Sequence, residues 1–316
     1  MQKYIQDDGA LENIPDRAVF QNQKENPVYV AVASFDQREQ QLVLCVDSLL
    51  HQVDHIFIYL NNYEHIPEPL LGNDKITVNR SQDYRDLSAT GKVYPLDTIT
   101  DCYFFTIDDD FAYPANYIAT MCMTIEKYNR KCAVTVHGSI FPDDFDWYYE
   151  RTAMFQYQGG IKNDVFVHLP GTGSFGFHTD TLKASFTNFV PNVMVDLTFA
   201  ILCKLQRVPM VTVKRPQFWM CNTEREGLYQ QFLVDKTHHT KYALKYAPWT
   251  FADYASYAIP ILEEIFGELS YEKCIKHDLD HSFVKSHLAG TRPRTWAHNS
   301  IQIERRLEAE GRSIHQ

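Results

Sequence analysis

The sequence lacks most features that mark secreted or membrane-spanning proteins. It has 7 cysteines, an odd number, and no two are spaced as Cys-x-x-Cys, so neither a disulfide framework nor a zinc module is indicated. The first 17 residues are polar and acidic and lack the basic start and apolar stretch of a signal peptide. Apolar stretches such as 28–33 are far shorter than the roughly 20 residues of a spanning helix. We therefore expect a reduced, cytoplasmic protein.

Positive charge is also scarce. The chain has 30 Lys+Arg against 40 Asp+Glu, which gives a formal net charge of −10. Binding to a nucleic-acid backbone or to an anionic membrane needs clustered cations. We therefore expect no nucleic-acid partner, and a membrane association only of a peripheral kind at the inner face.

The remaining composition is that of a folded protein. Hydrophobic residues make up 45% and charged residues 22% of the 316 positions, which is typical of a globular chain of one large or two smaller domains. Aromatic residues reach 14%, a content that suits both core packing and stacking on sugar rings.

Short β-rich stretches alternate with helical periodicity along most of the chain, which predicts an α/β fold with a mostly parallel sheet flanked by helices. Strands are predicted at 28–35, 55–60, 75–80, 102–107, 132–140 and 209–215, and helices at 36–53, 114–127 and 194–208. Loops and short antiparallel strands are predicted for 141–193, and C-terminal helices for 251–266 and 299–310. We divide the chain into a lead-in (1–26), a main domain (27–221) and a mostly helical C-terminal region (222–316).

Three consecutive carboxylates, Asp108, Asp109 and Asp110, follow the predicted strand at 102–107. Adjacent carboxylates at the end of a buried strand repel one another and lose hydration, so a fold tolerates them best where a cation binds. Mg²⁺ and Mn²⁺ take oxygen ligands, and ligands of α/β sheets bind beyond the carboxyl ends of the strands. The alternative is a solvated acidic turn that precedes the next helix.

The order of these motifs resembles a known family. A first strand at 28–35 is followed by a helix that ends Asp-Ser-Leu-Leu-His-Gln (47–52) and by a second strand, and the acidic cluster comes about fifty residues later. Asp196 then opens a helix. Over about 28–220 this resembles GT-A glycosyltransferases, especially the family-2 kind, which carry a DxD motif at the cluster's position. Family members usually have an aspartate where this chain has Asn61.

The resemblance implies a GT-A, Rossmann-type fold and a set of site residues. Asp108 and Asp110 would hold Mn²⁺ or Mg²⁺, with His239 completing the shell; His137, His168 and His178 are alternatives. Residues implied at the nucleotide-sugar donor are Ser34, Phe35, Asn61, Asp83, Asp86, Lys92, Asp108 and Asp109. For Asp83 and Asp86, an ordinary surface loop position is the slightly favoured alternative.

The resemblance also implies a general base. Asp196 would accept the proton of an acceptor hydroxyl, which makes the enzyme inverting. The alternative is an ordinary first-turn aspartate that interacts with the helix dipole. The segment 171–176, Gly-Thr-Gly-Ser-Phe-Gly, has the spacing of a dinucleotide-binding fingerprint, but no clean strand–loop–helix pattern surrounds it. The resemblance implies instead that this segment lies near the donor sugar and the acceptor, where glycines permit close approach. Aromatic residues that would stack on sugar faces or pack in the core are Trp147, Tyr148, Tyr149 and Trp219.

The function implied is a metal-dependent glycosyltransferase that moves a sugar from a nucleotide-sugar, most simply a UDP-sugar, to a glycan or glycolipid in polysaccharide biosynthesis. The region 222–316 would then serve as an acceptor site, a lid or a homo-oligomer contact. Two alternatives stay open: a sugar-phosphate nucleotidyltransferase, although 34–38 has no glycine, and a non-catalytic carbohydrate-binding protein. A DxDxT phosphatase is excluded because position 112 is alanine.

Overall fold

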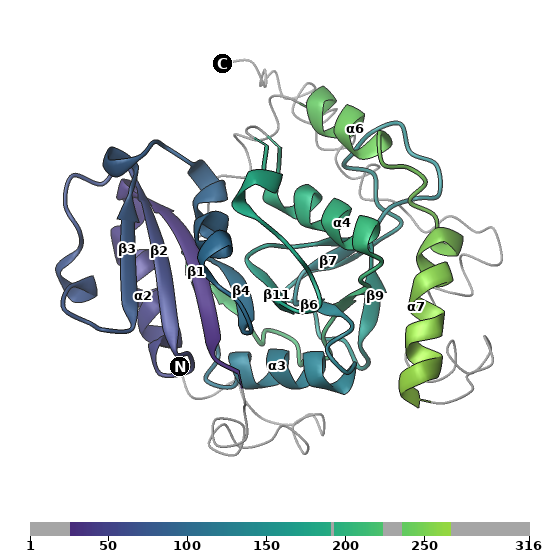
Figure 1. Ribbon diagram of the computed structural model, residues 1–316, viewed down its shortest axis with the longest axis horizontal. Coiled ribbons are helices and arrows are strands. Elements are labelled where there is room, and N and C mark those ends of the chain that lie inside the picture. The colour runs from purple at the N-terminus through teal and green to yellow at the C-terminus, as the bar shows by residue number, and fades with distance from the viewer. Residues whose placement is uncertain (1–25, 191–192, 224–235, 267–316) are drawn as a thin grey trace, which may run out of the picture.

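The computed structural model describes residues 26–190, 193–223 and 236–266, and these form an α/β fold (Figure 1). A mixed eight-stranded sheet has the order β3-β2-β1-β4-β11-β6-β12-β9. Its strands are β1 (Val28–Phe35), β2 (His55–Asn61), β3 (Ile76–Arg80), β4 (Tyr103–Asp108), β6 (Ala133–Thr135), β9 (Val165–Val167), β11 (Ser174–His178) and β12 (Met210–Thr212). The pairs β1–β2, β2–β3, β1–β4 and β6–β12 are parallel, whereas β11 runs antiparallel to β4 and β6, and β9 to β12. The predicted α/β class with a mostly parallel sheet is confirmed.

Helices cover both faces of this sheet (Figure 1), namely α2 (Glu39–Leu50) and α3 (Tyr117–Lys127) on one face and α4 (Val195–Gln206) on the other. In β1, Val30 and Val32 pack with α2 and α3, whereas Ala31 packs with α4 and its neighbours. A strand buried on both faces has no polar alternation, which is why 28–35 reads as one apolar run.

The prediction of one strand at 132–140 is wrong. The chain leaves the main sheet after Thr135, and β7 (Gly138–Ile140) joins a second sheet of order β10-β7-β8, with β8 at Ala153–Phe155 and β10 at Leu169–Pro170. At the break, the backbone N–H groups of Val136 and His137 both donate to Ser174 Oγ, at 3.1 and 3.3 Å. This side chain satisfies backbone groups that a strand would otherwise pair.

The segment 141–193 contains short antiparallel strands, as predicted, but β11 crosses into the middle of the main sheet. A two-stranded ribbon pairs β5 (Phe111–Ala112) with β13 (Cys221–Asn222) directly after the acidic cluster. Single turns and one longer stretch of 3₁₀ helix complete the description: η1 (Asp36–Arg38), η2 (Glu68–Leu70), η3 (Ser81–Asp83), η4 (Ser88–Thr98) and η5 (Phe186–Asn188).

C-terminal helices are present as predicted, namely α6 (Lys236–Leu244) and α7 (Phe251–Phe266). α7 lies beside β9 (Figure 1), where Leu262 packs on Val211 and Tyr254 binds the backbone of Met210. The predicted lead-in up to residue 25 and the predicted helix at 299–310 lie outside the described residues.

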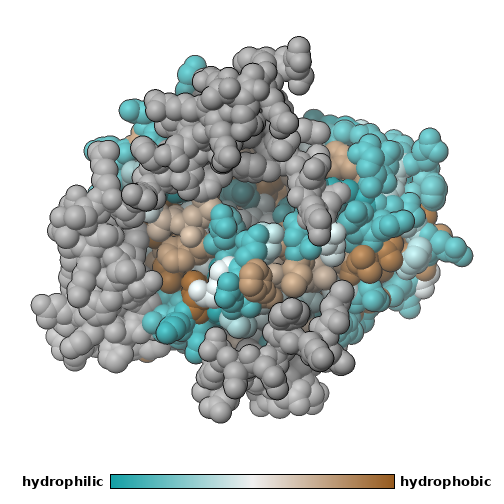
Figure 2. Space-filling model, turned by 180° about the vertical axis from the view of Figure 1, so that it is seen from behind, coloured by the Kyte–Doolittle hydropathy of each residue, from teal (hydrophilic) through white to brown (hydrophobic). Residues whose placement is uncertain are grey.

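No helix in the described part of the chain is long and apolar enough to cross a membrane. On the face seen in Figure 2, hydrophobic residues form a band between hydrophilic areas. Large hydrophobic side chains that are exposed come from separate elements, for example Leu44 in α2 and Leu205 in α4.

Candidate active site

A pocket of about 740 Å³ lies where β1 and β4 end and α4 begins. Phe35 lines it at the end of β1, Asp108 at the end of β4, and Asp196 in the first turn of α4. The carboxyl ends of neighbouring parallel strands share one edge of the sheet, and this is where α/β folds bind ligands. The topology thus brings together carboxylates that stand 88 positions apart between Asp108 and Asp196.

Asp108 forms an ion pair with Lys92, whose ammonium contacts Oδ1 of the carboxylate. Lys92 is buried, at 4% exposure, and sits in η4. Burial alone would lower the pKa of this lysine, but the charge and hydrogen bond of Asp108 outweigh it and raise the pKa. Lys92 is therefore a permanent cation against the pocket wall, while the Asp108 carboxylate stays partly exposed to the cavity.

Arg38 binds the other two carboxylates of the cluster. Its Nη1 lies 2.9 Å from Oδ1 of Asp109 and 3.5 Å from Oδ2 of Asp110. Burial, and next the charge of Asp108, raise the pKa of Asp110 to about 6. Oδ1 of Asp110 is buried without a hydrogen-bond partner among the described residues. A buried carboxylate oxygen without a donor, beside two further carboxylates, fits a hard divalent cation.

Asp196 also lines the pocket, and Thr172 binds its carboxylate. Both the backbone N–H and the Oγ1 hydroxyl of Thr172 donate to Oδ1 of Asp196, at 3.0 and 2.5 Å. Burial raises the pKa of Asp196, and the bonds from Thr172 and the charge of Lys92 oppose that rise. A carboxylate whose basicity is raised by its site is suited to general-base work.

Several residues predicted at the donor line the pocket, namely Phe35, Asp86, Lys92, Asp108 and Asp109. Asp86 also accepts hydrogen bonds from the side chain of Asn62 and the backbone of Ser88, at 3.0 and 2.7 Å. Its carboxylate therefore shapes the turn that leads into the pocket wall.

Ser34, Asn61 and Asp83 are not among the described residues that line the pocket. Asn61 is fully buried, and its Oδ1 accepts from the backbone N–H groups of Leu87 and Ser88 at 3.0 and 3.1 Å. The Asn61 side chain thus stabilises the turn that contains Leu87 and Ser88. Ser34 is buried and shares a hydrogen bond of 2.9 Å with the Tyr63 hydroxyl.

Asp83 is exposed, and its Oδ2 lies 3.6 Å from Nε of Arg80. This agrees with the surface position that was the alternative for Asp83. The direct contacts of Ser34, Asn61 and Asp83 with a donor stay predictions.

The predicted third metal ligand, His239, is buried, and its Nε2 accepts from the backbone N–H of Met194 at 3.2 Å. It does not line the pocket, and its role as a ligand stays a prediction. His137 does line the pocket. Burial, and next the charge of Arg215, lower its pKa to about 4, so its ring is neutral.

Pocket side chains that the sequence did not indicate include Arg38, Arg151 and Thr172. Arg151 is buried, its Nε donates to Ser139 Oγ at 2.8 Å, and its guanidinium lies 4.6 Å from the ring centroid of Phe141. Only Arg38 carried a usable signal, because a cation directly after the first strand reaches the same sheet edge as the acidic cluster.

The aromatic residues named from the sequence divide between two locations. Tyr148 and Tyr149 are buried in the core and also line the pocket. Trp147 and Trp219 pack partly buried against the two core clusters, and Trp219 donates to Asn116.

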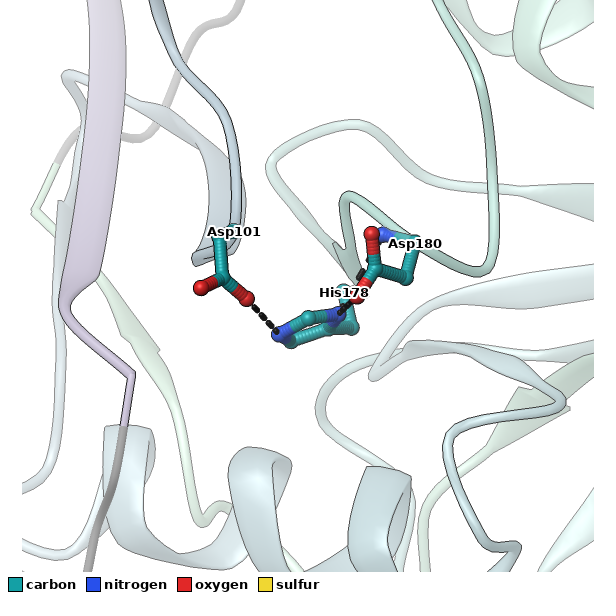
Figure 3. Close-up of side chains that lie close together, drawn as sticks. All are labelled: Asp101, His178 and Asp180. Atoms are coloured by element: carbon teal, nitrogen blue, oxygen red, sulfur yellow. Dashed lines mark hydrogen bonds and ion pairs between the residues drawn. The ribbon is translucent and has the colours of Figure 1, made fainter.

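A second group of potential metal ligands, Asp101, His178 and Asp180, lies at the end of β11 that is remote from the pocket (Figure 3). Nδ1 of His178 accepts the backbone N–H of Asp180 at 3.2 Å, so the neutral ring carries its proton on Nε2, which faces Asp101. A protonated Nε2 has no lone pair for a metal ion. The group therefore reads as a structural network, which Asn26 extends by donating to Asp101.

Comparison with known proteins gives no family assignment. No protein-family model and no curated protein matches the chain. The functional argument therefore rests on the residues that line the pocket.

Proposed function

We propose that the protein is a metal-dependent glycosyltransferase that uses a nucleotide-sugar donor and inverts the configuration of the transferred sugar. The observation that carries the proposal is the pairing, in one pocket, of an acidic cluster with a separate carboxylate. Asp108 and Asp110 of the cluster and Asp196, which accepts hydrogen bonds from Thr172, all line this pocket.

The cluster fits a divalent cation because a buried oxygen of Asp110 has no donor among the described residues, and because Asp108 opens to the cavity. Mn²⁺ or Mg²⁺ bound there would offset the charge of the donor diphosphate and of the leaving nucleotide. Lys92 and Arg38, the cations that bind the cluster, would offset part of its negative charge.

In the proposed reaction, Asp196 takes the proton from an acceptor hydroxyl as the hydroxyl oxygen forms a bond to the anomeric carbon. The bond between that carbon and the diphosphate breaks, and its electron pair leaves with the nucleotide. Direct displacement requires the base and the leaving group on opposite faces of the sugar, so the acceptor would approach from the side of Asp196 while the cluster binds the diphosphate.

The first experiment measures the melting temperature with Mn²⁺ and each of UDP, GDP, CMP and TDP, for the parent and for Asp110→Ala. A ligand that binds only the folded state raises the melting temperature, by mass action. We expect one nucleotide to stabilise the parent only when Mn²⁺ is present, and Asp110→Ala to abolish this effect.

Asp97→Ala is the matched control, because Asp97 is exposed in η4 and does not line the pocket. It should retain the full nucleotide effect. If no nucleotide stabilises the parent with or without Mn²⁺, the transferase proposal fails, and a carbohydrate-binding function without a donor becomes the better interpretation.

A further inference from the structure

A short turn joins the two halves of the proposed active site. The residues Gly171, Thr172 and Gly173 connect β10 to β11 and pass between Asp108 and Asp196. Thr172 is buried, at 7% exposure, and directs two donors to the same oxygen, Oδ1 of Asp196. Within the described residues, no hydrogen bond engages Oδ2.

The next residue of the turn is tied to the acidic cluster. The Tyr113 hydroxyl donates to the carbonyl oxygen of Gly173 at 2.6 Å and accepts from the backbone N–H of Asp108 at 3.0 Å. A side chain at position 173 would overlap the carboxylate of Asp108. Glycine thus permits the closest approach between the turn and the cluster.

The start of the turn is fixed as well. The backbone N–H of Gly171 donates to the carbonyl oxygen of His137 at 2.7 Å, and a Cβ at this position would come within 2.8 Å of the Cβ of His137. Both ends of the turn are therefore packed against the pocket wall, and Thr172 between them has little freedom to move.

We propose that Thr172 is a positioning residue for the transfer reaction: it occupies Oδ1 of Asp196 and leaves Oδ2 as the atom that receives the acceptor proton. The inference rests on the proposed function. It goes further by assigning the two oxygens of the base different tasks, and by coupling the base to the cluster through Gly173 and Tyr113.

The two donors also stabilise the ionised form of Asp196. Burial raises the pKa of Asp196, and the bonds from Thr172 lower it. The other charged groups that act on this carboxylate are Lys92 and Asp108. Removal of the Thr172 hydroxyl leaves both of these in place, so a change in the pH dependence would report the loss of that one donor.

The test compares Thr172→Val, which removes the hydroxyl and keeps the side-chain shape, with Thr172→Ser, which keeps the hydroxyl. Activity is measured as nucleotide release from the nucleotide-sugar whose nucleotide stabilises the parent, with Mn²⁺ present and water as the acceptor. We expect Thr172→Val to lower kcat about 10- to 100-fold through misplacement of the base, with little change in KM for the donor.

The acidic limb of its pH–rate profile should move up by about one pH unit, because a hydrogen bond to a charged group is lost. Thr172→Ser should recover most of the rate. In an Asp196→Asn background, Thr172→Val should lower the rate no further, because a positioning residue acts through the group it positions.

Thr124→Val is the control, since Thr124 is a buried threonine of α3 whose hydroxyl donates to the carbonyl oxygen of Thr120 at 2.9 Å, outside the pocket lining. Its kcat and pH profile should match the parent. A parent-like profile for Thr172→Val, or a rate loss that persists in the Asp196→Asn background, overturns the positioning role while leaving the transferase proposal intact. Absence of metal-dependent nucleotide binding by the parent overturns both.

Discussion

At the scale of single residues, Asp110 shows how a binding site opposes stability. Its side chain is buried beside two other carboxylates, and burial and the charge of Asp108 raise its pKa to about 6. Because the folded-state pKa is raised, the carboxyl contributes most to stability below its unfolded pKa, and that contribution is lost as pH rises through about 6.

This pH dependence of the stability predicts how Asp110→Asn behaves in the absence of metal. The variant should be more stable than the parent at pH 7 by about 1–2 kcal/mol, because its amide carries no charge to desolvate. The difference should shrink towards pH 4, where the parent is protonated. Urea unfolding from pH 4 to pH 8 measures it, and a difference that does not grow with pH would contradict the assigned pKa.

Residue types and positions were enough to predict part of the site. Asp108 was indicated by its place after a buried strand, at the sheet edge where ligands bind, whereas Asp196 was implied only by the resemblance to GT-A glycosyltransferases. Arg38 and Thr172 were not recognised as partners, because their contacts join separate segments: Arg38 meets Asp109 across 71 positions, and Thr172 meets Asp196 across 24. Nothing local in a sequence encodes such a pairing.

At the scale of elements, β11 packs against β4 through a glycine. Gly176 lies opposite Phe105 in the register of the two strands, and a Cβ at position 176 would overlap the ring. Since Phe105 is fully buried, its ring cannot turn away without a cost.

We therefore expect Gly176→Ala to lower the free energy of unfolding by about 1–3 kcal/mol through overpacking. Chemical denaturation of the purified variant measures this. Gly159→Ala is the control, because a Cβ there would make only an ordinary contact of 3.4 Å, and its stability should stay within about 0.5 kcal/mol of the parent. Equal stability of both variants would show that β11 can shift enough to accommodate a Cβ at position 176.

Elements were predictable where burial is uniform. The strand 28–35 was predicted with its observed bounds, since both of its faces are covered and 28–33 is free of charged residues. The strand break after Thr135 was not predictable, because it depends on Ser174, which arrives from β11. The helix 251–266 was found from its own periodicity.

At the scale of the whole molecule, a buried hydroxyl adds hydrogen bonds to the hydrophobic packing of α7 on the main sheet. Tyr254 accepts from the backbone N–H of Met210 at 2.7 Å and donates to its carbonyl oxygen at 3.0 Å. Upstream, Ala243 and Trp249 belong to the same core cluster as α4. The packing favours cooperative unfolding of these helices with the sheet, although the predicted boundary at 222 stays a prediction.

Tyr254→Phe should therefore lower the stability of the whole protein by about 2 kcal/mol, because two buried backbone groups of β12 lose their partner. Denaturation followed by both far-ultraviolet circular dichroism and tryptophan fluorescence should show one shifted transition. Tyr257→Phe, on the same helix, has no hydroxyl bond among the described residues and should behave as the parent. Separate transitions in Tyr254→Phe would mean that α7 unfolds by itself.

A buried thiol next to the backbone of the acidic cluster can report local opening of this region. Cys45 in α2 is fully buried, and its Sγ donates to the carbonyl oxygen of Asp108 at 3.3 Å. Burial raises the pKa of this thiol well above its usual value, so it reacts with an alkylating reagent only when the structure around it opens. The labelling rate of Cys45, followed by peptide mass spectrometry, therefore measures how often this region opens. Any ligand that binds the cluster and stabilises the region should lower that rate.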